Sequence, residues 1–508
     1  MSEKYFFIII FIFCFENISN LYICNMSYKL IKRHKLSFLL TAALAVITFS
    51  CSTRDDNKTF AQYLDKGEFT RLQHTIDSLK KSGTTQWSTF ELDSVEQLIH
   101  AIRVDYSRTE LEIREQLKNT FPSATDADQA NWEASGKLEM RYIDGEKRYF
   151  KNAVPNLRRL LDFDQNKNKP VWEQNVEPNS LTELRLAHTQ QVVEACVENP
   201  NAASSQQVTF AYTLTVKPNA VPAGETIRCW LPAPREGNPR QSDLQVLEAE
   251  PGDYTIAPNE CLQRTFYMEK KAVKDEATLF SVKFSVRTKP QYFNLKPENI
   301  QAYDTTSDIY QNNTIERPPH IVFSPEMKEL AQQIAGNETN PLKKVEAIYT
   351  WISDSIPWAS ALEYGTIPNI PQYVLANRHG DCGMQTLLFM TLARSQGIPV
   401  KWQSGFMLHP GFENLHDWCE VYYEGVGWVP LDQSFKLQPT SNKQLRNFYF
   451  QGIDTYRLIV NDDYAQKLYP EKKHPRSEPY DFQRGEVEWE KGNLYFDQWS
   501  WNMDVTYQ

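Results

Sequence analysis

The sequence has no excess of positive charge. Its 508 residues include 54 lysines and arginines against 64 aspartates and glutamates, which gives a net charge of −10. Nucleic-acid binding needs clustered basic surface, so this balance argues against a nucleic-acid partner. No glycine-rich phosphate loop is present either. With 41% hydrophobic and 23% charged residues, the composition is that of a folded protein. The length suggests about two to four domains.

Cysteines are few and irregularly spaced. Eight occur in the chain, and no pair of them has zinc-ligand spacing beside a histidine. A calcium-loop motif is also missing. These absences predict a protein with no metal and no other cofactor. If Cys382 stays free, Cys229 and Cys261 could form a disulfide, because both lie in one apparent β-domain, but the spacing does not fix any pairing.

Long apolar runs are confined to the N-terminal region. Basic residues between positions 29 and 35 precede an apolar run at 36–49, which ends at Ser50-Cys51. A basic region followed by an apolar region of this length is typical of a signal peptide. We therefore assign residues 1–50 to a signal region and expect the mature chain to begin at Cys51. No other stretch is long and apolar enough to cross a membrane.

Cys51 at this point resembles the lipidation site of bacterial lipoproteins, with diacylglycerol on the sulfur. The resemblance implies an exported lipoprotein of the bacterial cell envelope, on the periplasmic or the outer face, which contacts the membrane through its lipid anchor. Ordinary signal-peptidase cleavage after Ser50 is the alternative. The polar residues 51–59 would form a tether. Because Met26 begins a complete signal peptide, residues 1–25 could be absent from the translated protein; a two-segment anchor is the alternative.

The region after the tether carries mainly helical patterns. Ser88 with Glu91, and Ser107 with Glu110, have the form of capping boxes. A hairpin is expected at 142–146, where an Asp-Gly pair stands among the helices. No chemistry can be assigned to this region from its residues.

Further along, the period of the apolar residues changes to two. Every second residue is apolar at 208–216 and again at 280–286, which predicts an antiparallel β-sandwich. Alternation at 499–507 predicts a final strand. The predicted order is a signal region (1–50), a tether (51–59), a mainly helical region (60–200), a β-sandwich domain (206–295), a core (315–460) and C-terminal strands that pack on the core (461–508).

Within the core, Gly380-Asp381-Cys382 leads into an apolar helix that Gly397 is expected to end. Cys382 would lie in the first turn, where unpaired N–H groups and the helix dipole favour the thiolate. Asp381 is placed to cap the helix, so we expect the net effect to be a reactive thiol. The buried stripe of this helix is predicted to consist of Met384, Leu387, Leu388 and Thr391.

A second motif runs from His416 to Asp432 and predicts a β-hairpin with glycines at its turn. If the loop holds an odd number of residues, both side chains point to one face as direct or diagonal neighbours. Asp432 could then accept from one ring nitrogen of His416 and leave the other for the sulfur of Cys382. This is the arrangement of nucleophile, base and orienting group in a thiol version.

These motifs resemble those of the transglutaminase-like superfamily, which includes transglutaminases, peptide N-glycanases and bacterial thiol proteases or amidases of papain-like ancestry. The resemblance covers about residues 320–450. The matching pieces are Gly380-Asp381-Cys382, Arg394 with Gly397-Ile398-Pro399, Ser404-Gly405-Phe406, His416-Asp417-Trp418-Cys419-Glu420-Val421 and Gly427-Trp428-Val429-Pro430-Leu431-Asp432.

The resemblance implies an α+β multidomain protein whose papain-like core packs a nucleophile-bearing helix on an antiparallel sheet. Cys382 would be the nucleophile, His416 the general base and acid, and Asp432 the orienting group. The family usually has a small residue after the histidine. Asp417 stands there instead, on the opposite strand face from His416, so we expect it to leave the site little changed.

Other site residues stay open. The oxyanion-stabilising side chain of the family lies upstream of the cysteine, so Tyr364, Trp358 and Gln372 are all candidates, with Tyr364 preferred. The backbone N–H of Cys382 would be the other donor. His409 is a rival base, which we expect in a loop without a facing carboxylate.

The predicted reaction is attack of a cysteine thiolate on an amide carbonyl of a protein or peptide substrate, giving a thioester. If water resolves the thioester, the protein is a protease or amidase, which we favour by analogy with bacterial envelope relatives. If an amine resolves it, the protein is a protein-glutamine gamma-glutamyltransferase that forms crosslinks. The alternative from another class is a non-catalytic surface module that binds peptide or glycan.

Overall fold

The computed structural model describes residues 59–83 and 86–508. The signal region and the lipidation predicted at Cys51 lie outside these residues. No helix in the described segments is long and apolar enough to cross a membrane. The chain divides into two compact units, of which the first ends at Val154 and the second begins at Pro155.

The first unit combines helices with a small antiparallel sheet. Its strands β2 and β3 form the expected hairpin, and β1 pairs with β3. The capping box of Ser88 and Glu91 is confirmed. The second box consists of Thr109 and Glu112, not the predicted pair, because the chain stays extended as β1 until Thr109. The elements are α3 (Phe69–Ser82), α4 (Thr89–Asp105), β1 (Arg108–Thr109), α5 (Glu110–Thr120), α6 (Asp126–Ala134), β2 (Met140–Ile143) and β3 (Glu146–Tyr149).

The helical region predicted at 60–200 is not a single unit. Helix α7 (Ala153–Asn166) starts at the boundary between the two units, and α8 (Leu181–Ala195) belongs to the second. There α8 packs on the core, where the buried side chain of Gln438 donates to the Thr189 hydroxyl at 3.0 Å. Helical periodicity identified α8 but could not tell which unit covers its apolar face.

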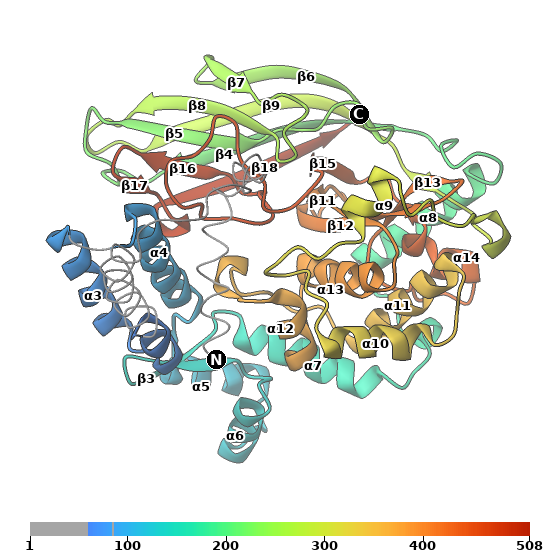
Figure 1. The fold of residues 1–508 in the computed structure, drawn as a ribbon, viewed down its shortest axis with the longest axis horizontal. Helices are drawn as coiled ribbons and strands as arrows, with labels where there is room; N and C mark the ends of the chain where they lie inside the picture. Colours follow the sequence, from blue (N-terminus) through green and yellow to red (C-terminus); the bar gives the residue numbers. More distant parts are fainter. Residues whose placement is uncertain (1–58, 84–85) are drawn as a thin grey trace, which may run out of the picture. The chain divides into compact units, whose positions relative to one another are not determined.

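The second unit contains a sandwich of two antiparallel sheets (Figure 1). One has the strand order β18-β4-β9-β6 and the other β17-β16-β5-β8-β7. The predicted alternation sets the pairing of β4 with β9, in which Val208 lies opposite Val286 and Leu214 opposite Phe280, all buried. The strands are β4 (Gln206–Val216), β5 (Thr226–Pro232), β6 (Gln241–Glu250), β7 (Tyr254–Ile256), β8 (Thr265–Lys271), β9 (Thr278–Thr288), β16 (Glu486–Trp489), β17 (Gly492–Asn493) and β18 (Trp499–Tyr507).

The C-terminal strands complete this sandwich, and β18 also contacts the predicted core, because the Tyr507 hydroxyl lies 2.7 Å from both the Leu408 oxygen and Glu413. Strand β18 pairs with β4 along its whole length, and β16 pairs with β5. In Figure 1 these red strands lie among the green ones. The alternating residues of β18 pack against the sandwich interior, with Trp499 buried and Met503 and Val505 partly buried. Period-two alternation predicts a strand but does not say which sheet has an open edge for it.

The core joins a four-stranded antiparallel sheet, in the order β13-β12-β11-β15, to a group of helices. Ser324 caps α10 and Asn340 caps α11. The elements are α9 (Asp308–Asn313), α10 (Pro325–Ala335), α11 (Pro341–Ser355), α12 (Ile370–Asn377), α13 (Cys382–Ser395), β11 (Val400–Met407), β12 (Asn414–Tyr423), β13 (Gly427–Leu431), α14 (Lys443–Arg446) and β15 (Arg457–Asn461), together with a short pair, β10 (Gln291–Tyr292) and β14 (Gly452–Ile453).

Helix α13 is the centre of the core and lies against β11 and β12 (Figure 1). All residues from Gly383 to Arg394 are buried, so the predicted stripe was right but too narrow. The helix ends as expected at Gly397, which adopts a left-handed conformation with φ of 73°. Hydrogen bonds from Ile398 to the Ala393 oxygen and from Gly397 to the Arg394 oxygen make this a Schellman motif.

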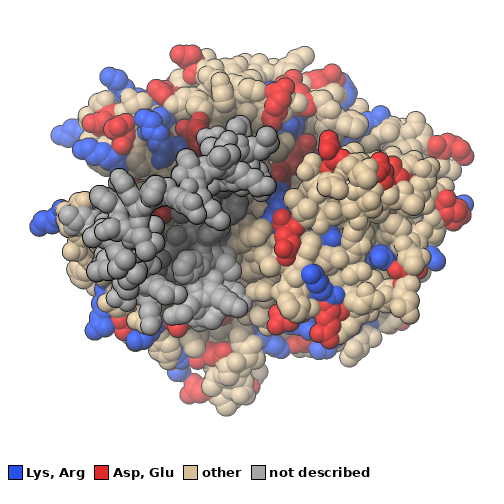
Figure 2. Space-filling view, viewed as in Figure 1, with Lys and Arg blue, Asp and Glu red and all other residues tan. Residues whose placement is uncertain are grey.

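Charged side chains of both signs are spread over the surface. On the face drawn in Figure 2, basic and acidic residues are interspersed across the described part of the chain. This pattern accompanies the net charge of −10 and offers no broad basic surface on that face.

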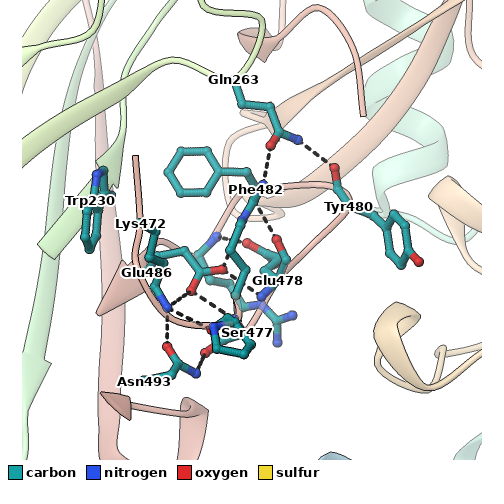
Figure 3. A network of polar contacts seen from close by, with 12 residues as sticks. Trp230, Gln263, Lys472, Ser477, Glu478, Tyr480, Phe482, Glu486 and Asn493 are labelled. Carbon is teal, nitrogen blue, oxygen red and sulfur yellow. Dashed lines mark hydrogen bonds and ion pairs between the residues drawn. The ribbon is translucent and has the colours of Figure 1, made fainter. Parts of the chain in front are cut away.

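The segment between β15 and β16 is fixed by a buried polar network (Figure 3). Glu486 accepts from the backbone N–H groups of Ser477 and Glu478 at 2.9 and 2.8 Å, and it lies 3.6 Å from the Lys472 ammonium. Lys472 also donates to Asn493 at 2.6 Å. A buried charge that is paired and hydrogen-bonded in this way holds the surrounding backbone in one arrangement. The segment then runs past the first turn of α13.

Candidate active site

Cys382 is the first residue of α13, as predicted, and its side chain is partly exposed. Asp381 caps the helix, because its Oδ1 accepts from the backbone N–H of Met384 at 3.1 Å. The Tyr364 hydroxyl donates to the same oxygen at 2.5 Å. The helix terminus therefore holds a thiol, a carboxylate and a phenol in one small space.

The thiol of Cys382 donates to Oδ2 of Asp417 at 3.3 Å. This contact overturns the expectation that Asp417 leaves the site little changed. Side-chain alternation along β12 directs Asp417 and His416 to opposite faces. Helix α13 packs against β12, and its first residue brings the sulfur to the carboxylate of Asp417.

The Cys382 thiol is a weaker acid here than in water. Burial raises its pKa well above the ordinary value, and the nearby carboxylates of Asp417 and Asp381 raise it further, while a backbone hydrogen bond from Asp417 lowers it. The prediction that the helix terminus produces a net reactive thiol is therefore wrong. Like charge and lost hydration outweigh a terminal dipole, which contributes at most about 2 kcal/mol.

The carboxylates beside the thiol also hold their own protons more tightly than usual. Burial, aided by the charge of Glu363, raises the pKa of Asp381 to about 6, although the Tyr364 hydroxyl opposes the shift. The pKa of Asp417 is raised well above its ordinary value by burial first, and then by the charges of Asp481 and Asp381. The site thus gathers acidic groups with raised pKa values around the sulfur.

His416 and Asp432 meet as predicted. Nε2 of His416 lies 2.7 Å from Oδ2 of Asp432, and both side chains are buried. The loop between β12 and β13 has three residues, Glu424 to Val426, so the two side chains are diagonal neighbours on one face. The described residues give no hydrogen bond between the His416 ring and the Cys382 thiol.

Arg457 completes this group, and sequence reasoning missed it. Its guanidinium donates to Oδ2 of Asp432 at 2.7 Å and to Oδ1 of Asp454 at 2.9 Å. The pKa of Asp432 falls below the ordinary range because the charges of His416 and Arg457 outweigh burial. The pKa of His416 is lowered, chiefly by burial, which Asp432 opposes and Arg457 reinforces. The ring is therefore neutral at pH 7.

His409 does face a carboxylate, contrary to expectation. Its Nε2 lies 3.1 Å from Oδ2 of Asp454, and both side chains are fully buried. Burial lowers the pKa of His409 to about 4. Asp454 also accepts from the Tyr449 hydroxyl at 2.7 Å. His409 is thus connected to the His416–Asp432 pair by hydrogen bonds that run through Asp454 and Arg457.

The three oxyanion candidates lie in different settings. Tyr364 is at the terminus of α13, and burial raises the pKa of its hydroxyl well above the ordinary value. Trp358 pairs through its backbone with Gly380, and its ring, 38% exposed, lies 5.1 Å from the Arg159 guanidinium. Gln372 is in the first turn of α12, where its N–H donates to the cap. Tyr364 is the candidate that hydrogen-bonds the residue next to Cys382, through Oδ1 of Asp381.

The segment after β15 contributes a further residue that the sequence did not reveal. Gln483 donates through Nε2 to the backbone oxygen of His416 at 2.8 Å and to Oδ1 of Asp417 at 2.9 Å. It is buried, and it lies 66 residues further along the chain than Asp417. No local motif marks it, because its role depends on how the segment folds back over β12.

A cavity of 160 Å³ adjoins this group, with Tyr364 and Asp381 among its lining residues. Arg484, the lining cation, is paired with Glu363 and with Glu478, each at 2.7 Å. The remaining acidic lining residue is Asp481, whose pKa is raised well above its ordinary value by burial and by the charge of Glu478.

Metals and disulfides were also considered in the sequence predictions. Within residues 59–83 and 86–508, no cluster of histidine, cysteine or acidic residues could hold a metal ion. The disulfide suggested between Cys229 and Cys261 does not form, since both are free; Cys229 is buried in the sandwich and Cys261 is partly exposed.

Comparison with known proteins identifies the core. Residues 328–433 match the family model of the transglutaminase-like superfamily. An uncharacterized protein of Haemophilus influenzae is 25% identical over 283 residues, which cover 49% of this chain and 74% of that protein. The uncharacterized protein YebA of Bacillus subtilis is 25% identical over 154 residues, which cover 27% of this chain and 20% of that one.

Solved structures were compared as well. A proposed cysteine protease from Cytophaga hutchinsonii has a TM-score of 0.43 and 15% identity, with 60% of this chain and 91% of that chain covered. The periplasmic domain of TgpA from Pseudomonas aeruginosa has a TM-score of 0.24 and 13% identity, with 54% and 98% covered. Residues 328–433 thus form a transglutaminase-like core, as the motifs indicated. The chain is an α+β multidomain protein built around that core.

Proposed function

We propose that the protein is an exported thiol hydrolase of the transglutaminase-like superfamily, which cleaves amide bonds in proteins or peptides. Cys382 attacks the amide carbonyl, the amine leaves, and water hydrolyses the thioester. The observation that carries the proposal is the position of the Cys382 thiol, 3.3 Å from the residue that directly follows His416, while His416 is held by Asp432 at 2.7 Å. The nucleophile thus lies beside the strand β12 that carries the acid–base residue His416.

His416 acts as the general base and acid, and Asp432 fixes its ring. A neutral imidazole can take a proton from its surroundings, and the Asp432 carboxylate stabilises the imidazolium that results. The backbone N–H of Cys382, unpaired at the helix start, donates to the oxyanion. Tyr364 is the second donor, once its hydroxyl turns from Asp381 to the substrate oxygen.

The setting of the enzyme is part of the proposal. The signal-peptide pattern and Cys51 support export to the bacterial cell envelope and a lipid anchor on that cysteine, on the periplasmic or outer face. Labelling of expressing cells with a fatty-acid analogue tests the anchor. Wild-type protein should take up the label and the Cys51→Ala variant should not.

The reaction is tested with purified mature protein, its Cys382→Ser variant and labelled casein, with and without a fluorescent primary amine. Release of peptides that depends on Cys382 supports the hydrolase. Cys382-dependent incorporation of the amine would instead identify a protein-glutamine gamma-glutamyltransferase. If neither wild type nor Cys382→Ser releases peptides or incorporates the amine, the result favours a non-catalytic module that binds peptide or glycan. Calcium should be varied in each assay.

A further inference from the structure

Asp417 occupies a position that a proton acceptor for the nucleophile requires. Its Oδ2 accepts from the Cys382 sulfur at 3.3 Å, and its Oδ1 accepts from Gln483 at 2.9 Å. Gln483 also donates through the same nitrogen, Nε2, to the backbone oxygen of His416. A general base must lie within hydrogen-bond reach of the proton it takes. Asp417 meets this condition in the present geometry, whereas no hydrogen bond among the described residues joins the thiol to the His416 ring.

The backbone beside the thiol leaves room for this contact. A Cβ atom on Gly383 would lie 2.7 Å from Oδ2 of Asp417 and 2.3 Å from the Tyr364 hydroxyl. Real Cβ atoms are not found at such distances, so a side chain at position 383 would displace the carboxylate or the phenol. The residue after the histidine is usually small in the superfamily that this chain resembles. The buried Asp417, which faces Gly383, therefore departs from the usual pattern of the superfamily.

Charge around Asp417 makes it a stronger base than an ordinary carboxylate. A free carboxylate is about 4.6 pKa units too weak to take a proton from a free thiol. Burial and the surrounding acidic groups raise the pKa of Asp417, and the same surroundings raise the pKa of the Cys382 thiol, so both groups shift in the same direction. Transfer of the proton from sulfur to Oδ2 also leaves the total charge of the pair unchanged, so no second charge is created in a buried place. The groups that face Asp417 are Cys382 and Asp381 at α13, Tyr364 before α12, and Glu478, Asp481 and Gln483 from the segment after β15.

We propose that Asp417 is a catalytic residue that takes the Cys382 proton and returns it to the leaving amine. This inference rests on the proposed hydrolase. In the first half of the cycle, the proton moves from sulfur to Oδ2, the thiolate forms the carbon–sulfur bond, the carbon–nitrogen bond breaks, and the nitrogen leaves with the proton from Asp417. In the second half, His416 takes a proton from water, the hydroxide adds to the thioester, the carbon–sulfur bond breaks, and His416 returns the proton to sulfur.

The leaving group tests this role. An amine leaves only with a proton, whereas p-nitrophenolate leaves without one. Wild type, Asp417→Asn and Asp417→Ala are compared on a peptide N-alkylamide, whose leaving group is an alkylamine, and on the matching p-nitrophenyl ester. We expect Asp417→Asn to lower kcat for the amide about 10²-fold or more, in line with loss of an acid–base group. The ester rate should fall much less, and it should recover at high pH as the thiol ionises without help.

Matched variants separate chemistry from folding. Asp417→Ala restores a small residue, Asp417→Asn keeps the shape and the Gln483 contact, and the exposed Asp253→Asn in the sandwich is the control for charge loss. Thermal melting checks that each variant folds. The proposal is overturned if Asp417→Asn and Asp417→Ala hydrolyse the amide as fast as wild type or faster. Asp417 would then suppress the reactivity of the Cys382 thiol. An equal fall for amide and ester would also overturn the proposal. If wild type has no Cys382-dependent turnover of either substrate, the proposed hydrolase fails, and the role of Asp417 with it.

Discussion

Arg457 donates to Oδ2 of Asp432 at 2.7 Å, the same oxygen that contacts Nε2 of His416. The Asp432 carboxylate is therefore shared between an imidazole and a permanent cation. Since Arg457 also binds Asp454, which contacts His409, two histidine–aspartate pairs are joined by one guanidinium. The proposed acid–base residue depends on this buried charge balance as much as on its own aspartate.

Replacement of Arg457 by methionine should destabilise the fold by about 3–5 kcal/mol, because two buried carboxylates lose their common cation. It should also raise the pKa of His416, since Arg457 lowers it. Urea unfolding measures the first effect and NMR titration of the ring the second. Arg457→Lys keeps the charge and should lose less stability. A methionine variant with unchanged unfolding free energy and an unchanged His416 titration would contradict this account.

His409 should make the protein sensitive to acid. Its pKa is lowered to about 4 in the folded state, against about 6.5 in the unfolded chain. The unfolded state therefore binds the proton more tightly, and stability falls as the pH drops below the unfolded value, levelling near the folded one. Between pH 7 and pH 5 this group should remove on the order of 2 kcal/mol.

The check is urea unfolding of wild type and His409→Gln at both pH values. The variant will be less stable at pH 7, because it loses the Asp454 contact. Its further loss on acidification should be smaller than that of wild type. Parallel losses in the two proteins would mean that His409 does not carry the acid sensitivity.

Gly383→Ala should damage the site more than the fold. The added methyl group meets the Tyr364 hydroxyl and the Asp417 carboxylate, so one of them must move away from the sulfur. We expect a stability cost of about 1–3 kcal/mol from overpacking and a clear fall in kcat. Gly492→Ala is the control, since a Cβ there meets nothing within 4 Å. If kcat of the Gly383 variant equals that of the control, the close approach at this glycine is irrelevant to activity.

Tyr364→Phe tests the second oxyanion donor. Loss of one such donor typically costs about 10²–10³ in kcat, with KM little affected. The pKa of Asp381 should rise above its present value of about 6, because the Tyr364 hydroxyl now lowers it. Steady-state kinetics, with the exposed Tyr469→Phe as control, measures the effect. A kcat within twofold of wild type would leave Trp358 and Gln372 as the candidates.

Several features of the protein follow from the sequence alone. The start of α13 at Cys382, its end at Gly397 and the meeting of His416 with Asp432 were all predicted correctly. Each depends on residues close together in the chain, where helical or strand periodicity and turn length fix which side chains share a face. A three-residue loop is enough to bring positions 416 and 432 together.

The tertiary structure alone decided the surroundings of that site. Asp417 reaches the sulfur because α13 packs on β12, and Gln483 and Arg457 arrive from segments whose positions no local pattern specifies. The pairing of β18 with β4 depends in the same way on which sheet edge is open. The acidity of the Cys382 thiol was predicted wrongly for a related reason. The pKa of Cys382 sums burial and every charge packed around the sulfur, so a helix terminus read from sequence predicted the wrong sign.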